Sequence, residues 1–222
     1  MMPLDAPLAA ETTLGGIVAA GPLATGLRRL AYGTVRDSLL GVQVVRADGR
    51  IIRRGGTVVK NVAGYDMARL QYGALGTLGI ITQLDLKLFP QPENSGAVLA
   101  GLAQWAQVGQ VIDRLMASRL QPATVALLKG EAAFQLGLDA PRLGWLLVRY
   151  EGRSAAVERQ LRDTRAWMDE AQAQEIFLWD AATLADYWPR LVNFANWPGL
   201  NRRPRCCGSM SCRVCWSKRW SR

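Results

Sequence analysis

Glycines at three-residue intervals are the first feature of this sequence that could support chemistry. They are Gly73, Gly76 and Gly79, within the stretch GGTVVKNVAGYDMARLQYGALGTLGIITQLDLKLFP that runs from residue 55 to residue 90. Each glycine allows a positive φ or a close backbone approach, which a loop lying against a flat or anionic ligand requires. Ordinary glycine turns are common, so this spacing alone leaves both a ligand-binding loop and a plain turn open.

The residues around these glycines predict the elements that hold the loop. A helix-like piece is expected over 63–72, before the glycines. After them, leucines alternate with charged residues from Leu84 to Leu88, which is the period of a half-buried strand. Upstream, apolar residues 40–45 and 51–52 flank Asp48-Gly49, and this pattern predicts a hairpin.

Two further turns could contact the same ligand. Thr13-Leu14-Gly15-Gly16 precedes a small-residue helix start at 17–20, and the amides of such a turn can face phosphate or ring oxygens. The alternative is a tight turn that packs on a helix. Arg36 and Asp37, after Gly33, read as an ordinary surface ion pair. Lys60 could face a ring or a carboxylate, or lie solvated at an edge.

The stretch KNVAGYDMARLQYGALGTLGIIT resembles the second half of the FAD-binding domain of the vanillyl-alcohol-oxidase type, also called the PCMH type, of FAD-linked oxidases. Its variant VVKNVAGYD, at 58–66, is most similar to the FAD-binding subunit of bacterial glycolate oxidase. Ala74 and Leu75 stand where the wider family commonly has Ser and Glu, and that subunit also varies there. The segment 30–37 resembles the family's Tyr-Gly-x-x-x-Asp loop beside the flavin.

The resemblance implies an FAD-dependent oxidoreductase that acts on CH–OH donors. In this family the flavin takes a hydride equivalent from a 2-hydroxy acid such as glycolate, giving a 2-oxo acid such as glyoxylate. Electrons then leave through a second FAD-linked subunit and an iron–sulfur subunit, so the redox chemistry belongs to the cofactors. We assign no catalytic acid or base. The residues expected to contact FAD through their backbones are Thr13, Gly15, Gly16, Gly33, Gly76, Thr77, Gly79 and Ile81.

A second α+β unit is predicted after the linker at 90–96. Strands are expected at 98–102, 124–128, 134–136, 145–150 and 176–179, with helices at 106–118 and 154–171, the latter capped by Ser154. This β-α-β-β-α-β order predicts a ferredoxin-like unit, and in the resembling family a cap domain over the flavin has this position. The tryptophans at 105, 145, 167, 179, 188 and 197 are expected to be packing residues.

The chain is therefore expected to divide into three parts. Residues 1–92 form the partial PCMH-type domain, 93–200 a partial cap and 201–222 a basic, Cys-rich tail. By the resemblance, a subdomain with the glycine-rich loop for the flavin pyrophosphate should precede residue 1, so the sequence reads as truncated there. We accordingly expect the isolated chain to retain FAD weakly or not at all.

The excess charge belongs to the tail. The formal net charge is +9, but residues 201–222 hold seven basic residues and no acidic one, so the remainder has 20 basic against 18 acidic residues, or +2. The tail's four cysteines include the spacing Cys207-x4-Cys212-x2-Cys215, which imitates a metal site without a complete ligand set. Its arginines and tryptophans could also bind nucleic acid. We favour a frameshifted end, and predict neither a metal site nor a nucleic-acid partner. A non-catalytic fragment is the other alternative.

The residue types that this sequence lacks exclude several kinds of site and bear on the expected location of the protein. The sequence has no histidine, which excludes histidine bases, histidine metal sites and a histidyl-linked flavin. Residues 1–92 and 93–200 contain no cysteine, which fits a reducing cytoplasm. The start has no basic region followed by an apolar run typical of a secretory signal. We expect a cytoplasmic protein with at most peripheral membrane association.

Overall fold

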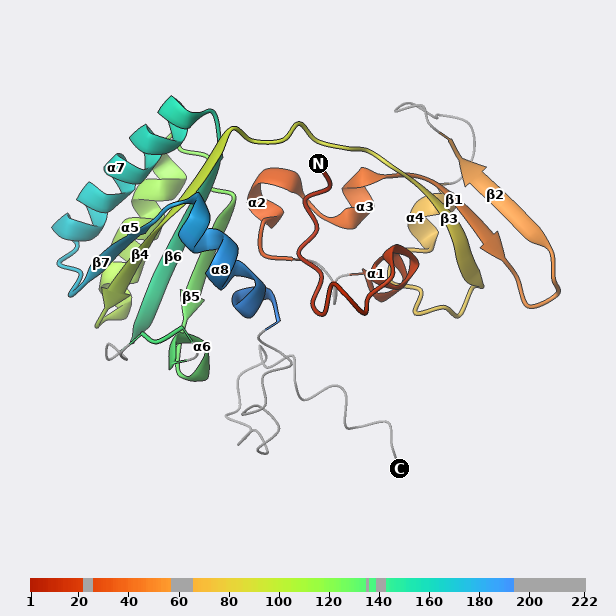
Figure 1. The fold of residues 1–222 in the computed structure, drawn as a ribbon, viewed down its shortest axis with the longest axis horizontal. Helices are drawn as coiled ribbons and strands as arrows, with labels where there is room; N and C mark the ends of the chain where they lie inside the picture. The colour runs from red at the N-terminus through yellow and green to blue at the C-terminus, as the bar shows by residue number, and fades with distance from the viewer. Residues whose placement is uncertain (22–25, 57–65, 135, 139–142, 194–222) are drawn as a thin grey trace.

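The computed structural model describes residues 1–21, 26–56, 66–134, 136–138 and 143–193. The described chain forms two antiparallel sheets, with the N-terminal segment and helix α2 (Arg29–Tyr32) between them (Figure 1). The expected α+β class is confirmed. Lys60, Trp197 and the tail from 201 to 222 lie outside the described residues, so the hypotheses about them stay predictions.

The first sheet has three strands in the order β2-β1-β3. Its strands are β1 (Leu39–Val45), β2 (Ile51–Gly55) and β3 (Ile80–Leu86), and both neighbours pair antiparallel with β1. The predicted hairpin at Asp48-Gly49 is confirmed: the Arg46 amide donates to the Arg50 carbonyl, and Gly49 has φ +77°. The leucine alternation correctly predicts β3, although the strand ends at Leu86, before Leu88.

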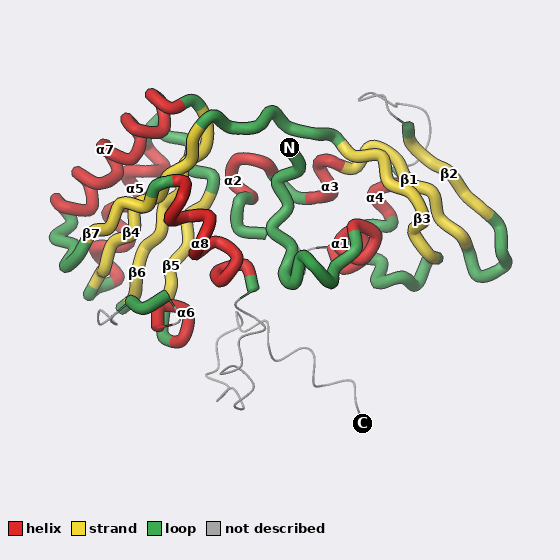
Figure 2. Tube along the Cα trace, viewed as in Figure 1, coloured by secondary structure: helices red, strands yellow, loops and turns green. Residues whose placement is uncertain are grey.

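Two short helices and one of seven residues pack around this sheet (Figure 2). Helix α1 (Leu14–Ala20) buries Ile17 and Val18, while α3 (Val35–Ser38) and α4 (Met67–Leu70) bury Val35 and Ala68 in the same cluster. Strand β1 adds Leu39, a residue of that cluster. The helix expected over 63–72 is confirmed only for 67–70; Asp66 caps it, and 63–65 lie outside the described residues.

The second sheet has four strands in the order β5-β6-β4-β7, all antiparallel. They are β4 (Asn94–Leu102), β5 (Thr124–Leu128), β6 (Gly144–Gly152) and β7 (Ile176–Trp179). The helices are α5 (Trp105–Ala117), α6 (Glu131–Phe134), α7 (Ser154–Glu170) and α8 (Ala181–Val192).

Helices cover both faces of this sheet, which explains why β4 and β6 are almost continuously apolar in sequence. Side chains such as Val98 and Val148 face α5 and α7, where they form one cluster with Val111 and Met168. Their neighbours on the strands, including Leu99, point to the opposite face and form a second cluster that α8 helps to cover (Figure 1). Successive residues of β4 and β6 thus still alternate between the two faces of the sheet, although both faces are buried.

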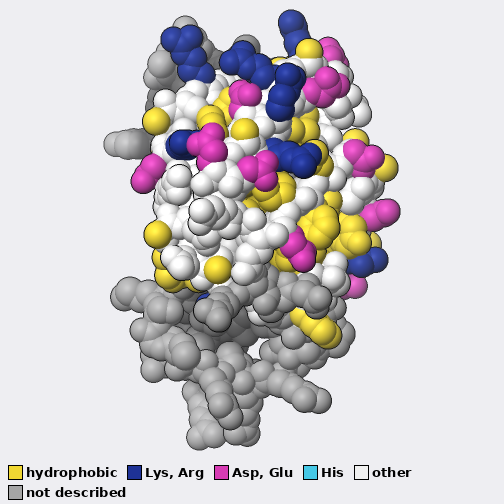
Figure 3. Space-filling model, turned by 90° about the vertical axis from the view of Figure 1, so that its left-hand side faces the viewer, with side chains coloured by type: hydrophobic (Ala, Val, Ile, Leu, Met, Phe, Trp, Pro, Cys, Tyr) yellow, Lys and Arg dark blue, Asp and Glu magenta, His cyan; other side chains and the backbone are white. Residues whose placement is uncertain are grey.

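Charged residues occupy the outer surface of α7. Arg159 pairs with Asp163, and Arg165 pairs with Asp169, each four residues apart along the helix. Figure 3, seen from the left of Figure 1, shows basic and acidic side chains interspersed with small apolar areas.

None of the helices in the described part of the chain has the length and apolar run that a membrane crossing needs.

Four details of the second unit differ from expectation. Strand β4 begins at Asn94, inside the predicted linker. Phe134 ends helix α6 instead of opening a strand, because the amides of Ala133 and Phe134 turn back to the Gly130 carbonyl. Ser154 is the first residue of α7, and the N-cap is Arg153, without a side-chain cap bond. Trp105 is 66% exposed, so it is no packing residue, whereas Trp145 and Trp179 are buried as predicted.

Candidate functional site

The fold brings most of the predicted flavin residues to one surface. The loop 73–81 lies alongside helix α1: the Gly73 amide donates to the Val18 carbonyl and the Leu75 amide to the Ala19 carbonyl, both at 2.9 Å. At the other end of α1, Gly15 lies against Ile81, within 3.5–3.7 Å of where a Cβ on Gly15 would be. We call residues 13–16 and 73–81 together the glycine surface.

This surface is open and unusually apolar for an exposed one. Leu14, Leu75, Leu78 and Ile80 are 50%, 66%, 42% and 72% exposed. Thr13, Gly16, Gly76 and Thr77 are exposed as well. Clustered exposed apolar side chains are characteristic of surfaces that contact a ligand or another protein. The glycine surface therefore has the composition of a contact surface, with bare backbone between apolar side chains.

Its hydroxyls and one of its glycines already have local structural roles. Thr13 Oγ1 accepts the Gly16 amide at 3.0 Å and caps α1, while Thr77 Oγ1 donates to the Ala74 carbonyl at 2.7 Å. Gly79 has φ +137°, and a Cβ there would lie 2.6 Å from the Val45 carbonyl oxygen. The packed-turn alternative thus accounts for Thr13 and Gly79. Gly76, with φ +76° and nothing within 4 Å of a Cβ, faces open space.

The eighth predicted residue, Gly33, is in a different place, at the turn between α2 and α3. Its φ is +69°, and Asp37 fills the space beside it. The Asp37 carboxylate accepts both the amide and the hydroxyl of Thr34 at 2.8 Å, so Asp37 is a capping residue rather than a mere surface partner of Arg36. These bonds, the backbone one first, lower the pKa of Asp37.

Acidification should therefore weaken the Gly33 turn. Because the folded-state pKa of Asp37 is lowered, its stabilising effect is present above its ordinary pKa of 3.8 and is lost as the pH falls through the lowered value. In the variant Asp37→Asn, the difference between the melting temperatures at pH 6 and pH 3 should be smaller than in the unmodified chain. An equal difference in both proteins would show that the Asp37 carboxylate does not contribute.

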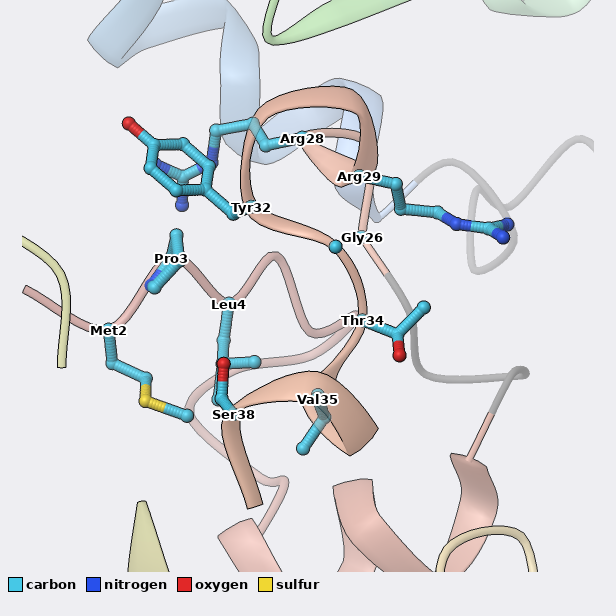
Figure 4. A pocket seen from close by; sticks show the side chains of 11 residues that line it. Met2, Pro3, Leu4, Gly26, Arg28, Arg29, Tyr32, Thr34, Val35 and Ser38 are labelled. Carbon is cyan, nitrogen blue, oxygen red and sulfur yellow. The ribbon is translucent and has the colours of Figure 1, made fainter. Parts of the chain in front are cut away.

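Gly33 also lines a small cavity with Leu4, Arg28, Tyr32 and Thr34 (Figure 4). In this view the Arg28 and Tyr32 side chains lie on one side of α2, and Arg29 points away. The cavity volume is about 20 Å³, which suffices for a water molecule and not for an organic substrate. This cavity is therefore too small to be a substrate site.

A cluster of charged side chains beside this cavity joins the N-terminal segment and α2 to the second sheet and α8. We call it the junction cluster; its members, from four separate segments of the chain, are Asp5, Arg28, Tyr32, Arg149, Glu151 and Trp188. The Asp5 carboxylate accepts the amides of Leu27 and Arg28 at 3.2 Å, the Arg28 guanidinium at 2.9–3.1 Å and the Trp188 indole N–H at 2.9 Å.

Glu151 lies at the centre of the other half of the junction cluster. Its side chain is 1% exposed, and Oε1 contacts Arg149 Nη2 at 2.6 Å and Arg28 Nη1 at 3.5 Å, while Oε2 accepts the Tyr32 hydroxyl at 2.7 Å. The Arg149 guanidinium lies 3.9 Å from the centre of the Trp188 ring. Burial lowers the pKa of Arg149, whereas burial and the bond to Glu151 raise the pKa of Tyr32.

Sequence reasoning missed the junction cluster. Its members lie up to 183 residues apart, so no local motif contains them. One signal was available: Arg149 and Glu151 interrupt the apolar run GWLLVRYEG, and charges in a buried strand are seldom placed there without partners. Among the described residues no group of three or more His, Cys, Asp and Glu side chains could hold a metal ion.

Comparisons with known proteins agree with the resemblance. The family described as FAD linked oxidases, C-terminal domain, matches residues 91–202. The glycolate oxidase subunit GlcD of Bacillus subtilis (strain 168) is 36% identical over 171 residues, which are 74% of this chain and 36% of that protein. The subunit GlcE of Escherichia coli (strain K12) is 36% identical over 127 residues, 57% of this chain and 35% of that protein.

A solved structure shares the fold as well. An alkyldihydroxyacetonephosphate synthase superposes with a TM-score of 0.61 at 19% sequence identity, over 83% of this chain and 37% of that chain. The chain spans about a third of the length of the two glycolate oxidase subunits. Because the family match covers half of the chain, the protein is a member of the FAD-linked oxidase family.

Proposed function

We propose that this chain supplies part of the FAD site of an oxidoreductase that acts on 2-hydroxy acids, through the glycine surface. The observation that carries the proposal is the convergence of seven predicted residues on that surface. They are Thr13, Gly15, Gly16, Gly76, Thr77, Gly79 and Ile81, which come from two stretches about 60 residues apart in sequence.

The residues present fit a flavin. Gly76 presents its backbone without a side chain and with open space around it, and the flanking Leu75 and Ile80 offer apolar area. A flat, partly apolar ring system that carries hydrogen-bonding edges suits such a surface. When bound, FAD would accept a hydride equivalent from the substrate. The residues of this chain would bind the cofactor and orient it, and exclude water from one side of it.

The finer parts of the proposal are the substrate, the partners and the location. Glycolate as substrate, with a second FAD-linked subunit and an iron–sulfur subunit as partners, is supported by two relatives that are glycolate oxidase subunits. We further propose a cytoplasmic location with at most peripheral membrane contact.

We also propose that residues 1–92 form a partial FAD domain and residues 93–200 a ferredoxin-like cap. The strand order β5-β6-β4-β7 of the second sheet supports the cap.

FAD binding tests the proposal, and Gly76→Asn is the informative variant. Asparagine tolerates a positive φ, so the fold should persist, while its side chain projects into the space proposed for the cofactor. We expect FAD to bind about tenfold more weakly, which corresponds to about 1.4 kcal/mol. Equilibrium titration with fluorescence detection is suitable, since a weak complex would not survive desalting.

The matched control is Gly130→Asn. Gly130 also has a positive φ, +59°, with nothing within 4 Å of a Cβ, and it lies beside the second sheet, before α6. This variant should bind FAD as the unmodified chain does. If excess FAD gave no fluorescence change and no protection of amides 73–81 from hydrogen exchange, the glycine surface would not be a flavin site, and the non-catalytic alternative would stand.

A further inference from the structure

The hydroxyl of Tyr32 connects a predicted flavin contact to the second sheet. Tyr32 directly precedes Gly33, and its hydroxyl donates to Glu151 Oε2 at 2.7 Å. Arg28, one helical turn earlier, contacts Glu151 Oε1 at 3.5 Å. Residues four apart lie on the same face of a helix, so α2 and its N-cap residue Arg28 present two side chains to one carboxylate.

Glu151 itself is held firmly. It lies near the end of β6, where it pairs with Ser95 of β4. Arg149 Nη2 lies 2.6 Å from Oε1, and the Arg149 guanidinium is stacked on Trp188 of α8. With its side chain 1% exposed, Glu151 loses little conformational freedom when it binds Tyr32, because packing has already fixed it.

The other side of Tyr32 is fixed by the segment between the sheets. The Tyr32 ring meets the Phe89 ring edge-to-face, with centroids 5.3 Å apart. The Tyr32 ring therefore keeps an apolar contact even without its hydroxyl. The hydroxyl's separate effect is to tie the end of α2, and the Gly33 turn that follows, to the carboxylate of the second sheet.

We propose that Glu151 is a positioning residue for the Gly33 turn, acting through the Tyr32 hydroxyl, so that the second sheet sets the place of a predicted flavin contact. The part of this inference that concerns FAD rests on the function proposed above. The part that concerns the turn rests on the contacts of Glu151 alone. Removal of the hydroxyl should loosen residues 29–38 without unfolding either sheet.

The test compares Tyr32→Phe with Tyr150→Phe. Tyr150 also has a phenol hydroxyl with one side-chain partner, Thr164 Oγ1 at 2.6 Å, but this pair lies within the second unit, between β6 and α7. Hydrogen exchange of amides 29–38 should be about tenfold faster in Tyr32→Phe, the effect of one lost hydrogen bond to a charged group. In Tyr150→Phe the exchange of these amides should be unchanged.

Two further measurements complete the experiment. Glu151→Gln keeps an oxygen that can accept the Tyr32 hydroxyl, so its exchange at 29–38 should be slower than in Glu151→Ala. FAD titration should show about tenfold weaker binding to Tyr32→Phe than to Tyr150→Phe. The inference is overturned if Tyr32→Phe exchanges as the unmodified chain does, or if Tyr150→Phe loosens 29–38 equally. If the unmodified chain binds no FAD, the proposed function fails, and the exchange data still decide the role of Glu151.

Discussion

Replacing Asp5 with alanine should lower the free energy of unfolding by about 3–5 kcal/mol, the range found when one partner is removed from a buried charge pair. The Asp5 side chain is 3% exposed. Its loss would leave the Arg28 guanidinium without its nearer counter-ion and the Trp188 indole N–H without its acceptor. Urea unfolding of both proteins, monitored by circular dichroism, measures the difference.

Two controls separate burial from charge. Glu170→Ala removes an exposed acid that pairs with Arg114, and exposed pairs contribute about 0–1 kcal/mol. Asp5→Asn keeps an acceptor oxygen but removes the charge, so its effect should lie between those of the two alanine variants. A loss below 1 kcal/mol in Asp5→Ala would mean that the junction cluster does not stabilise the fold.

Gly79→Ala should cost about 3 kcal/mol, because a side chain at this position is strained in two ways. The φ of +137° lies in a region that residues other than glycine rarely adopt, and a Cβ would lie 2.6 Å from both the Val45 carbonyl oxygen and Val44 Cγ1. Strand β1 is central in its sheet, so its backbone cannot easily move away. The variant should therefore unfold at lower urea concentration.

Gly76→Ala is the matched comparison for this effect. Its φ of +76° is also positive, but nothing lies within 4 Å of a Cβ there. Only the conformational cost remains, about 1–2 kcal/mol. Equal losses at the two positions would show that contact with β1 is not what requires glycine at Gly79.

Local patterns predicted most of the fold, because they act over a few residues. The alternation from Leu84 gave β3, and Asp48-Gly49 gave the hairpin. Element ends were less predictable. Ser154 looked like a helix cap, yet α7 starts one residue earlier than a Ser154 cap would allow. The Phe-Gln-Leu segment at 134–136 looked like a strand, but an isolated three-residue pattern cannot distinguish a strand from a helical turn.

The candidate site was predictable only in part. The resemblance selected α1 and the loop 73–81, and the structure places them together; the flavin contact itself remains a prediction. The resemblance gave no indication that β1 approaches Gly79 too closely for a side chain, because this contact is tertiary. The junction cluster depends on tertiary structure, because Asp5, Arg28 and Glu151 come from three segments of the chain that are far apart in sequence.

The bond between Asp5 and Trp188 has a consequence for synthesis of the protein. Its partners are 183 residues apart, and a ribosome adds about 5–20 residues per second, so Asp5 emerges about 10–40 s before Trp188. Until α8 is made, the Asp5 side chain, which is 3% exposed in the folded chain, lacks the Trp188 indole, and the junction cluster is incomplete. We therefore expect the yield of soluble protein to depend on chaperones that bind the nascent chain before α8 is made.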